Sequence, residues 1–153
     1  MPNARPARTA RRRALQVITA GACLLMVRQA QSTPETLAAA LRESFGEAPI
    51  TSGRIKLEIP RLAENGNIVP VSISVDSPMS EQDYVKSVHL FAERNPLPRI
   101  LDVELGPRNG RARVATRIRL AVSQQVRAVA VMSDGALWFT AADVEVTVGG
   151  CDP

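Results

Sequence analysis

The chain has 153 residues, of which 45% are hydrophobic, and a formal net charge of +4. This is the length of one ordinary domain. The charge is uneven: residues 1–30 hold six of the 19 basic residues and no acid, so the rest of the chain has 13 basic residues against 15 acidic ones. A mildly acidic body lacks the basic excess of a nucleic-acid-binding domain, and no nucleic-acid partner is expected.

The N-terminal segment has the composition of an export signal. Three arginines at positions 11–13 precede residues 14–27, which are uncharged and mostly apolar. Such a run is too short to cross a membrane comfortably. Arg11 and Arg12, followed by Leu15, are similar to the paired arginines of a twin-arginine signal. We therefore expect residues 1–30 to be a signal peptide and the mature protein to reach the periplasm by the twin-arginine route.

Two alternatives for this segment stay open. An ordinary signal peptide has the same order of charged and apolar regions, and Ala14 stands where the twin-arginine signal usually has Phe. Residues 20–23 also resemble, faintly, a lipoprotein attachment site ending at Cys23. The cleavage point is not fixed by the sequence.

A single short helix is predicted after the signal. Thr33-Pro34-Glu35 is typical of a helix start, with an N-cap residue, proline at the first position and an acid in the first turn. Apolar residues then recur at helical spacing from Leu37 to Phe45, and Gly46 fits the stop.

From residue 54 onward the period of the pattern changes to two, which is typical of half-buried strands. Turn residues such as Asn65-Gly66 and Ser133-Asp134-Gly135 separate the apolar runs. Short strands with turns roughly every 8–12 residues predict a mainly β fold, an immunoglobulin-like antiparallel β-sandwich over residues 31–148. The expected strands cover residues 54–59, 69–75, 85–92, 100–105, 112–122, 126–132, 136–140 and 144–148.

The C-terminal end carries the reactive group. Once residues 1–30 are removed, Cys151 is the one cysteine left, and a single cysteine in an exported protein is a reactive thiol or an intermolecular partner. Gly149 and Gly150 precede it, and glycine runs act as flexible linkers. We predict that residues 149–153 are a flexible arm, which gives Cys151 a reach of roughly 10 Å beyond Val148.

Independent catalysis is not expected. His89 is the one histidine and lies in a predicted mid-chain strand without a visible triad partner, and a mobile arm would not hold Cys151 against it. The chain has no Cys/His cluster and no glycine-rich phosphate loop, so neither a metal nor a cofactor is predicted.

A group of four arginines falls on one face of the strand predicted after residue 111. They are Arg111, Arg113, Arg117 and Arg119. The group is either a solvated face or a surface that meets an acidic partner.

Taken together, several short motifs resemble SoxY, the sulfur-carrier subunit of the periplasmic thiosulfate-oxidising Sox system. The resemblance covers residues 45–151 and depends on the order of the motifs more than on any one of them. The motifs are Glu64-Asn65-Gly66-Asn67, Val69-Pro70-Val71, Val75-Asp76-Ser77-Pro78-Met79, Asn95-Pro96, Thr116-Arg117-Ile118-Arg119-Leu120-Ala121, Ser133-Asp134-Gly135 and Val146-Thr147-Val148-Gly149-Gly150-Cys151.

The resemblance implies a function. Cys151 matches the cysteine that holds sulfur intermediates covalently, and Gly149 and Gly150 match its swinging arm. The implied partners are a SoxZ-like subunit in a heterodimer, a c-type cytochrome that conjugates thiosulfate, a manganese-dependent hydrolase that releases sulfate, and a sulfane dehydrogenase. The carrier itself is then not an enzyme.

One departure from the family's pattern affects this expectation. Asp152-Pro153 stand where the usual ending, Gly-Gly-Cys-Gly-Gly, has its last two glycines. The added carboxylates disfavour a thiolate and repel anionic thiosulfate, and Pro153 stiffens the end. The alternatives are therefore a divergent carrier of another sulfur species and an interaction module that no longer carries thiosulfate.

Overall fold

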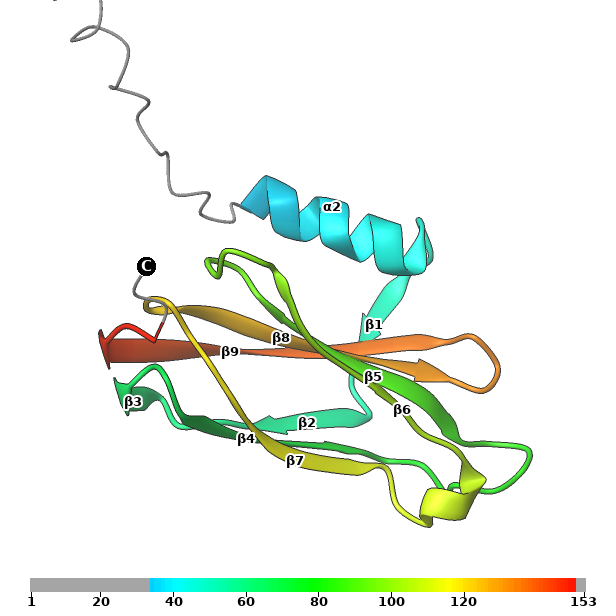
Figure 1. Ribbon diagram of the computed structural model, residues 1–153. Helices are drawn as coiled ribbons and strands as arrows, with labels where there is room; N and C mark the ends of the chain where they lie inside the picture. The colour runs from blue at the N-terminus through cyan, green and yellow to red at the C-terminus, as the bar shows by residue number, and fades with distance from the viewer. Residues whose placement is uncertain (1–33, 151–153) are drawn as a thin grey trace, which may run out of the picture.

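The chain folds into a two-layer β-sandwich with one helix on its outer side (Figure 1). A computed structural model describes residues 34–150, and this part confirms the predicted β-sandwich with a short N-terminal helix. Its elements are α2 (Pro34–Phe45), β1 (Ile50–Ser52), β2 (Ile55–Glu58), β3 (Leu62–Asn65), β4 (Val69–Val75), β5 (Val85–Ala92), β6 (Arg99–Glu104), the 3-10 helix η1 (Pro107–Asn109), β7 (Arg113–Ile118), β8 (Gln124–Met132) and β9 (Leu137–Val148).

The larger sheet has the strand order β1-β9-β8-β5-β6. Its centre is β8, which includes the expected strand at residues 126–132. Val126 and Ala128 of β8 belong to the core between the two sheets, whereas Val129 belongs to the cluster on the opposite face. The strand is buried from both sides because a second sheet covers one face and the helix covers the other.

The last strand differs from its prediction. Residues 136–140 and 144–148 were expected to be two strands, because Ala141, Ala142 and Asp143 are poor strand formers. In the structure β9 is continuous, and these three residues pair with Arg127, Val126 and Gln125 of β8. Pairing along the whole of β8 therefore overrides the local preference.

Two short strands were missed, and both run parallel to β9. β1 pairs with its beginning and β3 with its end, where Asn65 lies opposite Val148. Strands of three and four residues are too short to show a clear alternation in the sequence. The sandwich is thus antiparallel except along this one edge of β9.

The smaller sheet has the order β2-β4-β7. The alternation in β4 is regular: Val69, Val71, Ile73 and Val75 are buried against the core, and each such side chain stabilises the fold by about 1.5–3 kcal/mol. The residues between them face outward. β7 ends at Ile118, earlier than the predicted residue 122, because the chain then leaves the smaller sheet and crosses to β8.

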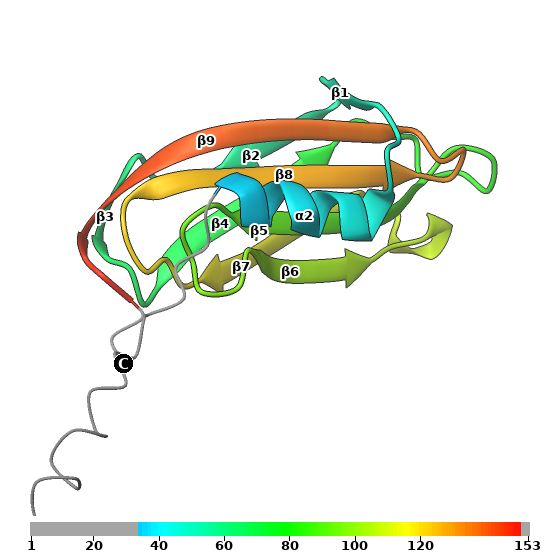
Figure 2. The same ribbon diagram turned by 90° about the horizontal axis from the view of Figure 1, so that it is seen from above.

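Helix α2 packs on the outer face of the larger sheet (Figure 2). Its apolar side includes Leu37 and Phe45, which lie in one cluster with Phe91 of the sheet. The helix ends as predicted: Gly46 has a φ of 67° and its N–H donates to the Arg42 carbonyl at 2.7 Å. No helix among the described residues is long and apolar enough to cross a membrane.

Candidate functional site

The end of β9 is tied to two other parts of the chain. The Gly66 N–H donates to the Val148 carbonyl at 2.7 Å, and the Gly150 N–H donates to the Leu120 carbonyl at 2.9 Å. A third bond closes the set, since the Leu120 N–H donates to the Gly66 carbonyl at 2.8 Å. We call this arrangement the glycine clasp. Its members are Gly66, Leu120, Ala121, Gly149 and Gly150.

The three glycines of the clasp are needed for close approach. A Cβ on Gly150 would overlap the Gly66 backbone, and a Cβ on Gly149 would overlap the Ala121 carbonyl oxygen. A Cβ on Gly66 would lie 2.7 Å from the Gly150 amide nitrogen. None of the three has a φ in the left-handed region. The obstacles are main-chain atoms, which cannot swing away as a flexible side chain would, so other residues would force the segments apart.

The clasp corrects the prediction of a flexible arm that begins at Gly149. Gly150 is buried and both glycines pack against other segments, so the fold holds the chain two residues further than expected. The glycines match a linker in composition, but tertiary contacts fix them. Cys151, Asp152 and Pro153 lie outside the described residues, as do Arg11 and Arg12. Cys151 directly follows the last residue of the clasp.

Two buried amide side chains support the crossing segment of the clasp. Asn95 donates to the Arg119 carbonyl at 2.8 Å and accepts from the Ala121 N–H at 2.9 Å. Gln124 donates to the same Asn95 oxygen at 2.8 Å. Asn95 thus fixes the backbone on both sides of Leu120. Nothing local in the sequence indicates that the Asn95 amide crosses to residues 119–124.

The four arginines lie at the open edge of the smaller sheet. Arg113 and Arg117 are outward residues of β7, opposite Ser74 and Pro70 of β4. Arg111 and Arg119 flank the strand, and all four are exposed. We call these four residues the arginine row. None of them takes part in an ion pair within the described part of the chain.

The nearest acid on this face is already paired. Glu58 accepts from the Lys56 ammonium at 2.6 Å. This hydrogen bond and the charge of Lys56 lower the pKa of Glu58; partial desolvation opposes them, and the charge of Arg113 adds the weakest contribution. Glu58 thus forms its ion pair with Lys56 and not with a residue of the arginine row.

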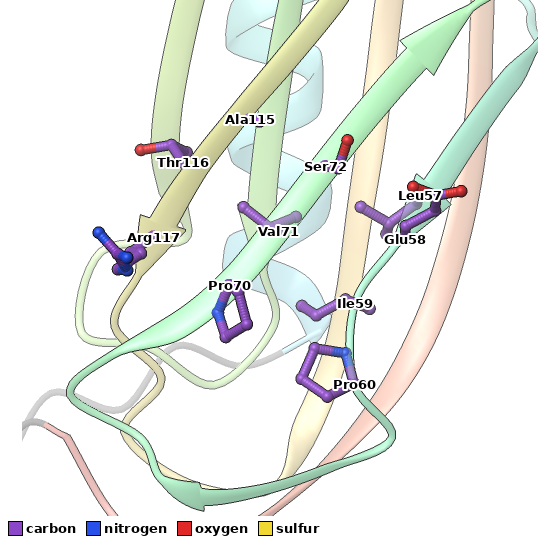
Figure 3. Close-up of a pocket in the computed structure, with 10 residues that line it drawn as sticks. All are labelled: Leu57, Glu58, Ile59, Pro60, Pro70, Val71, Ser72, Ala115, Thr116 and Arg117. Atoms are coloured by element: carbon purple, nitrogen blue, oxygen red, sulfur yellow. The ribbon is translucent and has the colours of Figure 1, made fainter.

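A shallow pocket of about 690 Å³ adjoins the row (Figure 3). Ile59, Pro60, Pro70 and Val71 give it apolar surface, while Arg117 and Glu58 lie on opposite sides of it. The pocket therefore combines apolar surface with one basic and one acidic side chain.

His89 has partners that the sequence did not reveal. Its Nδ1 lies 2.6 Å from an Asp102 carboxylate oxygen, and its Nε2 lies 2.9 Å from the Ser87 hydroxyl. The Phe45 ring meets the imidazole edge to face at 5.1 Å between ring centres. The expectation that His89 has no triad partner is thus wrong as to geometry. Both sides of Ser87 are paired in the sheet, with Glu104 and Val131, so its backbone forms part of the ladder.

The structure does not bring these groups to one place. Ser87, His89 and Asp102 lie on the helix-covered face of the larger sheet, whereas the arginine row is on the smaller sheet. Among residues 34–150 no group of three or more His, Cys, Asp or Glu side chains is placed to hold a metal ion. The exit of the chain at Gly150, beside Arg119, is the candidate functional site.

Comparisons with known proteins point to one family. The model of the family described as sulfur oxidation protein SoxY matches residues 41–151. The sulfur carrier protein SoxY from Chlorobium limicola f. thiosulfatophilum has a similar structure, with a TM-score of 0.62 and 27% identity, covering 74% of this chain and 98% of that one. A search of curated proteins found no match.

Other similar structures share the fold alone. A superoxide reductase (neelaredoxin) from Ignicoccus hospitalis gives a TM-score of 0.55 at 17% identity, covering 75% of this chain and 94% of that one. A putative superoxide reductase from Thermotoga maritima gives 0.53 at 16% identity, covering 63% and 86%. At these identities the likeness concerns the β-sandwich and not its chemistry.

Proposed function

The chain belongs to the SoxY family of sulfur oxidation proteins, and on that premise we propose that it is a periplasmic carrier that holds sulfur intermediates on the Cys151 thiol. The family and the likeness to a sulfur carrier support a carrier role in sulfur oxidation. The glycine clasp is the observation that supports the specific role proposed for Cys151. It holds the chain as far as Gly150, the residue that immediately precedes Cys151 in the sequence.

The chemistry of loading requires an electron acceptor. Cys151 and thiosulfate give a cysteine S-thiosulfonate, with a new S–S bond, one released proton and two electrons. The c-type cytochrome that the family implies would accept those electrons. Hydrolysis of the bond between the outer sulfane sulfur and the sulfonate sulfur then yields sulfate and a cysteine persulfide, consuming one water and releasing one proton. The carrier supplies the thiol and its position, while the enzymes supply the oxidation and the hydrolysis.

The proposed partners and cellular location also follow from membership of the SoxY family. The family implies a place in the Sox system, typically beside SoxZ, and we propose a heterodimer with a SoxZ-like subunit. The thiosulfate-conjugating cytochrome, the manganese-dependent hydrolase and the sulfane dehydrogenase would then act in turn on Cys151. Arg11 and Arg12 in residues 1–30 support export to the periplasm by the twin-arginine route.

Intact mass spectrometry tests the carrier proposal. The protein is purified from cells grown on thiosulfate and measured before and after reduction, beside a Cys151→Ser variant. We expect reducible sulfur adducts on the natural protein and none on the variant. A thiol that stays unmodified during turnover with the partner enzymes would show that the protein is not a carrier.

Asp152 and Pro153 favour a second candidate, a divergent carrier whose cargo is not thiosulfate. The Asp152 carboxylate, next to the thiol in the sequence, opposes an anionic substrate. The same mass measurement separates the two, since a persulfide that appears without a thiosulfonate precursor indicates another sulfur donor.

A further inference from the structure

The clasp shortens the reach of the thiol. A residue spans at most about 3.3–3.6 Å of extended chain, and Cys151 is one residue beyond the held Gly150. The predicted arm, by contrast, spanned three residues from Val148. An enzyme that acts on the sulfur must therefore bring its active site almost to the surface at Gly150. It then needs a contact surface on the carrier right beside this exit.

The arginine row occupies that position. Arg119 is bonded directly to Leu120, whose carbonyl accepts the Gly150 N–H at 2.9 Å. From there the row follows β7 through Arg117 to Arg113, along the outer edge of the smaller sheet. One end of the row thus lies next to the exit of the chain.

The surface around the row is accessible. The nearest outward neighbours of the arginines on the smaller sheet are small: Ser72 and Ser74 of β4 and Ala115 of β7. Beyond them, Lys56 and Glu58 of β2 form an ion pair with each other, so none of the four guanidinium groups has an ion-pair partner among the described residues. Exposed cations are suited to ion pairs with an opposing acidic surface.

Apolar anchor points flank the charges. The pocket of about 690 Å³ beside Arg117 has Pro60, Pro70 and Ile59 in its lining. Ile68 is 60% exposed and stands next to Arg119, because the following Val69 pairs with Ile118. Interfaces combine apolar pockets with charged rims in which arginine is enriched. If the arginines only kept the exposed edge of β7 from pairing with other strands, no apolar pocket would be needed beside them.

We infer that the arginine row and its pocket form the docking surface for the enzymes that act on Cys151. The partner is a protein whose active-site entrance is rimmed by Asp and Glu and which places one apolar side chain against Pro60 and Pro70. This inference rests on the carrier proposal, because it names the surface that positions the carrier's partners. The complementary charges speed the association of the two proteins, and the apolar pocket fixes their relative position.

The test measures thiosulfate conjugation by the thiosulfate-oxidising c-type cytochrome purified from the same cells, as kcat/KM over a range of ionic strength. Arg117→Glu is compared with Arg42→Glu, which makes the same charge change on α2 in the opposite layer. We expect Arg117→Glu to lower kcat/KM about tenfold at low ionic strength, and Arg113→Glu with Arg117→Glu to lower it further. Arg42→Glu should stay within about twofold of the natural protein.

Two controls separate docking from other effects. Alkylation of Cys151 by iodoacetamide, which is uncharged and needs no protein contact, should proceed equally in all variants. Size-exclusion chromatography with the SoxZ-like subunit should show the heterodimer in all of them. Equal kcat/KM for Arg117→Glu and the natural protein would overturn the inference, as would loss of the heterodimer in Arg117→Glu alone, because the surface would then belong to SoxZ. Absence of any adduct on the natural protein would instead refute the carrier proposal.

Discussion

Replacing Gly66 or Gly150 by alanine tests whether these glycines are packed tightly, as in the glycine clasp, or act as a flexible linker. A linker glycine tolerates alanine, and the reduced freedom of the unfolded chain then stabilises the fold by about 0.4–1 kcal/mol. The clasp predicts the opposite sign. A Cβ on Gly66 meets the Leu120 carbonyl oxygen, the Gly150 nitrogen and a Val146 methyl group. The segments must separate, and the Gly66 bonds to Val148 and Leu120 are strained or lost.

The magnitude follows from those bonds. Each contributes about 0.5–1.5 kcal/mol, so Gly66→Ala should cost about 1–3 kcal/mol of unfolding free energy, and the melting temperature should fall by roughly 4–10 °C. Gly150→Ala should lower the free energy of global unfolding by less, because the end of the chain can separate locally while the rest of the fold stays intact. Its effect should appear as faster hydrogen exchange at the Gly66 amide, since the Val148 carbonyl moves away.

Gly106→Ala is the matched control. Gly106 has an extended φ of −162°, and a Cβ there meets nothing within 4 Å. Gly106→Ala should therefore leave amide exchange unchanged and should not destabilise the fold in urea, with a gain of up to about 1 kcal/mol. If Gly66→Ala and Gly150→Ala behave as Gly106→Ala does in both measurements, the glycines are a linker and the clasp is refuted.

Four further predictions concern other parts of the molecule. Asn95→Ala should cost about 2–4 kcal/mol in urea unfolding, because it removes the acceptor of the part-buried Ala121 N–H, one of the two acceptors of the Gln124 amide, and the donor to the Arg119 carbonyl; a cost no greater than that of the exposed Asn109→Ala would contradict this role. His89→Ala should destabilise by about 1–2 kcal/mol through loss of the Phe45 contact and the Asp102 bond. Ser87→Ala should leave hydrolysis of p-nitrophenyl acetate unchanged, and a fall to background would instead reveal a working triad. Replacement of Asp152-Pro153 by Gly-Gly should raise the rate of thiosulfate conjugation by a standard Sox cytochrome, because it removes the Asp152 carboxylate beside the thiol; an unchanged rate means that tail charge does not matter.

Local patterns were sufficient to predict much of the fold. The alternation from Val69 to Val75 predicted β4 because one of its faces is buried and the other is not. Gly46 predicted the end of α2 because a left-handed residue at that point is a property of the chain itself. The outward direction of Arg113 and Arg117 followed from the same alternation. Each of these features depends on neighbours within a few residues.

The site could not be predicted in the same way, because it depends on register between distant segments. Gly66, Leu120 and Gly150 meet only after β3, β9 and the β7–β8 crossing are in place. The Asn65-Gly66 pair does mark a turn, and the Asn65 side chain accepts from the Asn67 N–H at 2.9 Å. The sequence could not show that this turn abuts the chain end. The pairing of His89 with Asp102 likewise depends on the register of β5 against β6.

The clasp and the arginine row bear on the effect of the charged residue that follows Cys151. Asp152 is two residues beyond Gly150 in the sequence. Arg119 adjoins Gly150 through Leu120, whose carbonyl accepts the Gly150 N–H. A thiol on a long neutral arm would be insensitive to the charge of its own domain. If Cys151 is the carrier thiol, the cations of the row would partly offset the Asp152 carboxylate, which would otherwise repel an anionic substrate. The replacement of the usual glycines by Asp152-Pro153 is therefore compatible with a carrier whose local charge balance is set by the surface beside the exit.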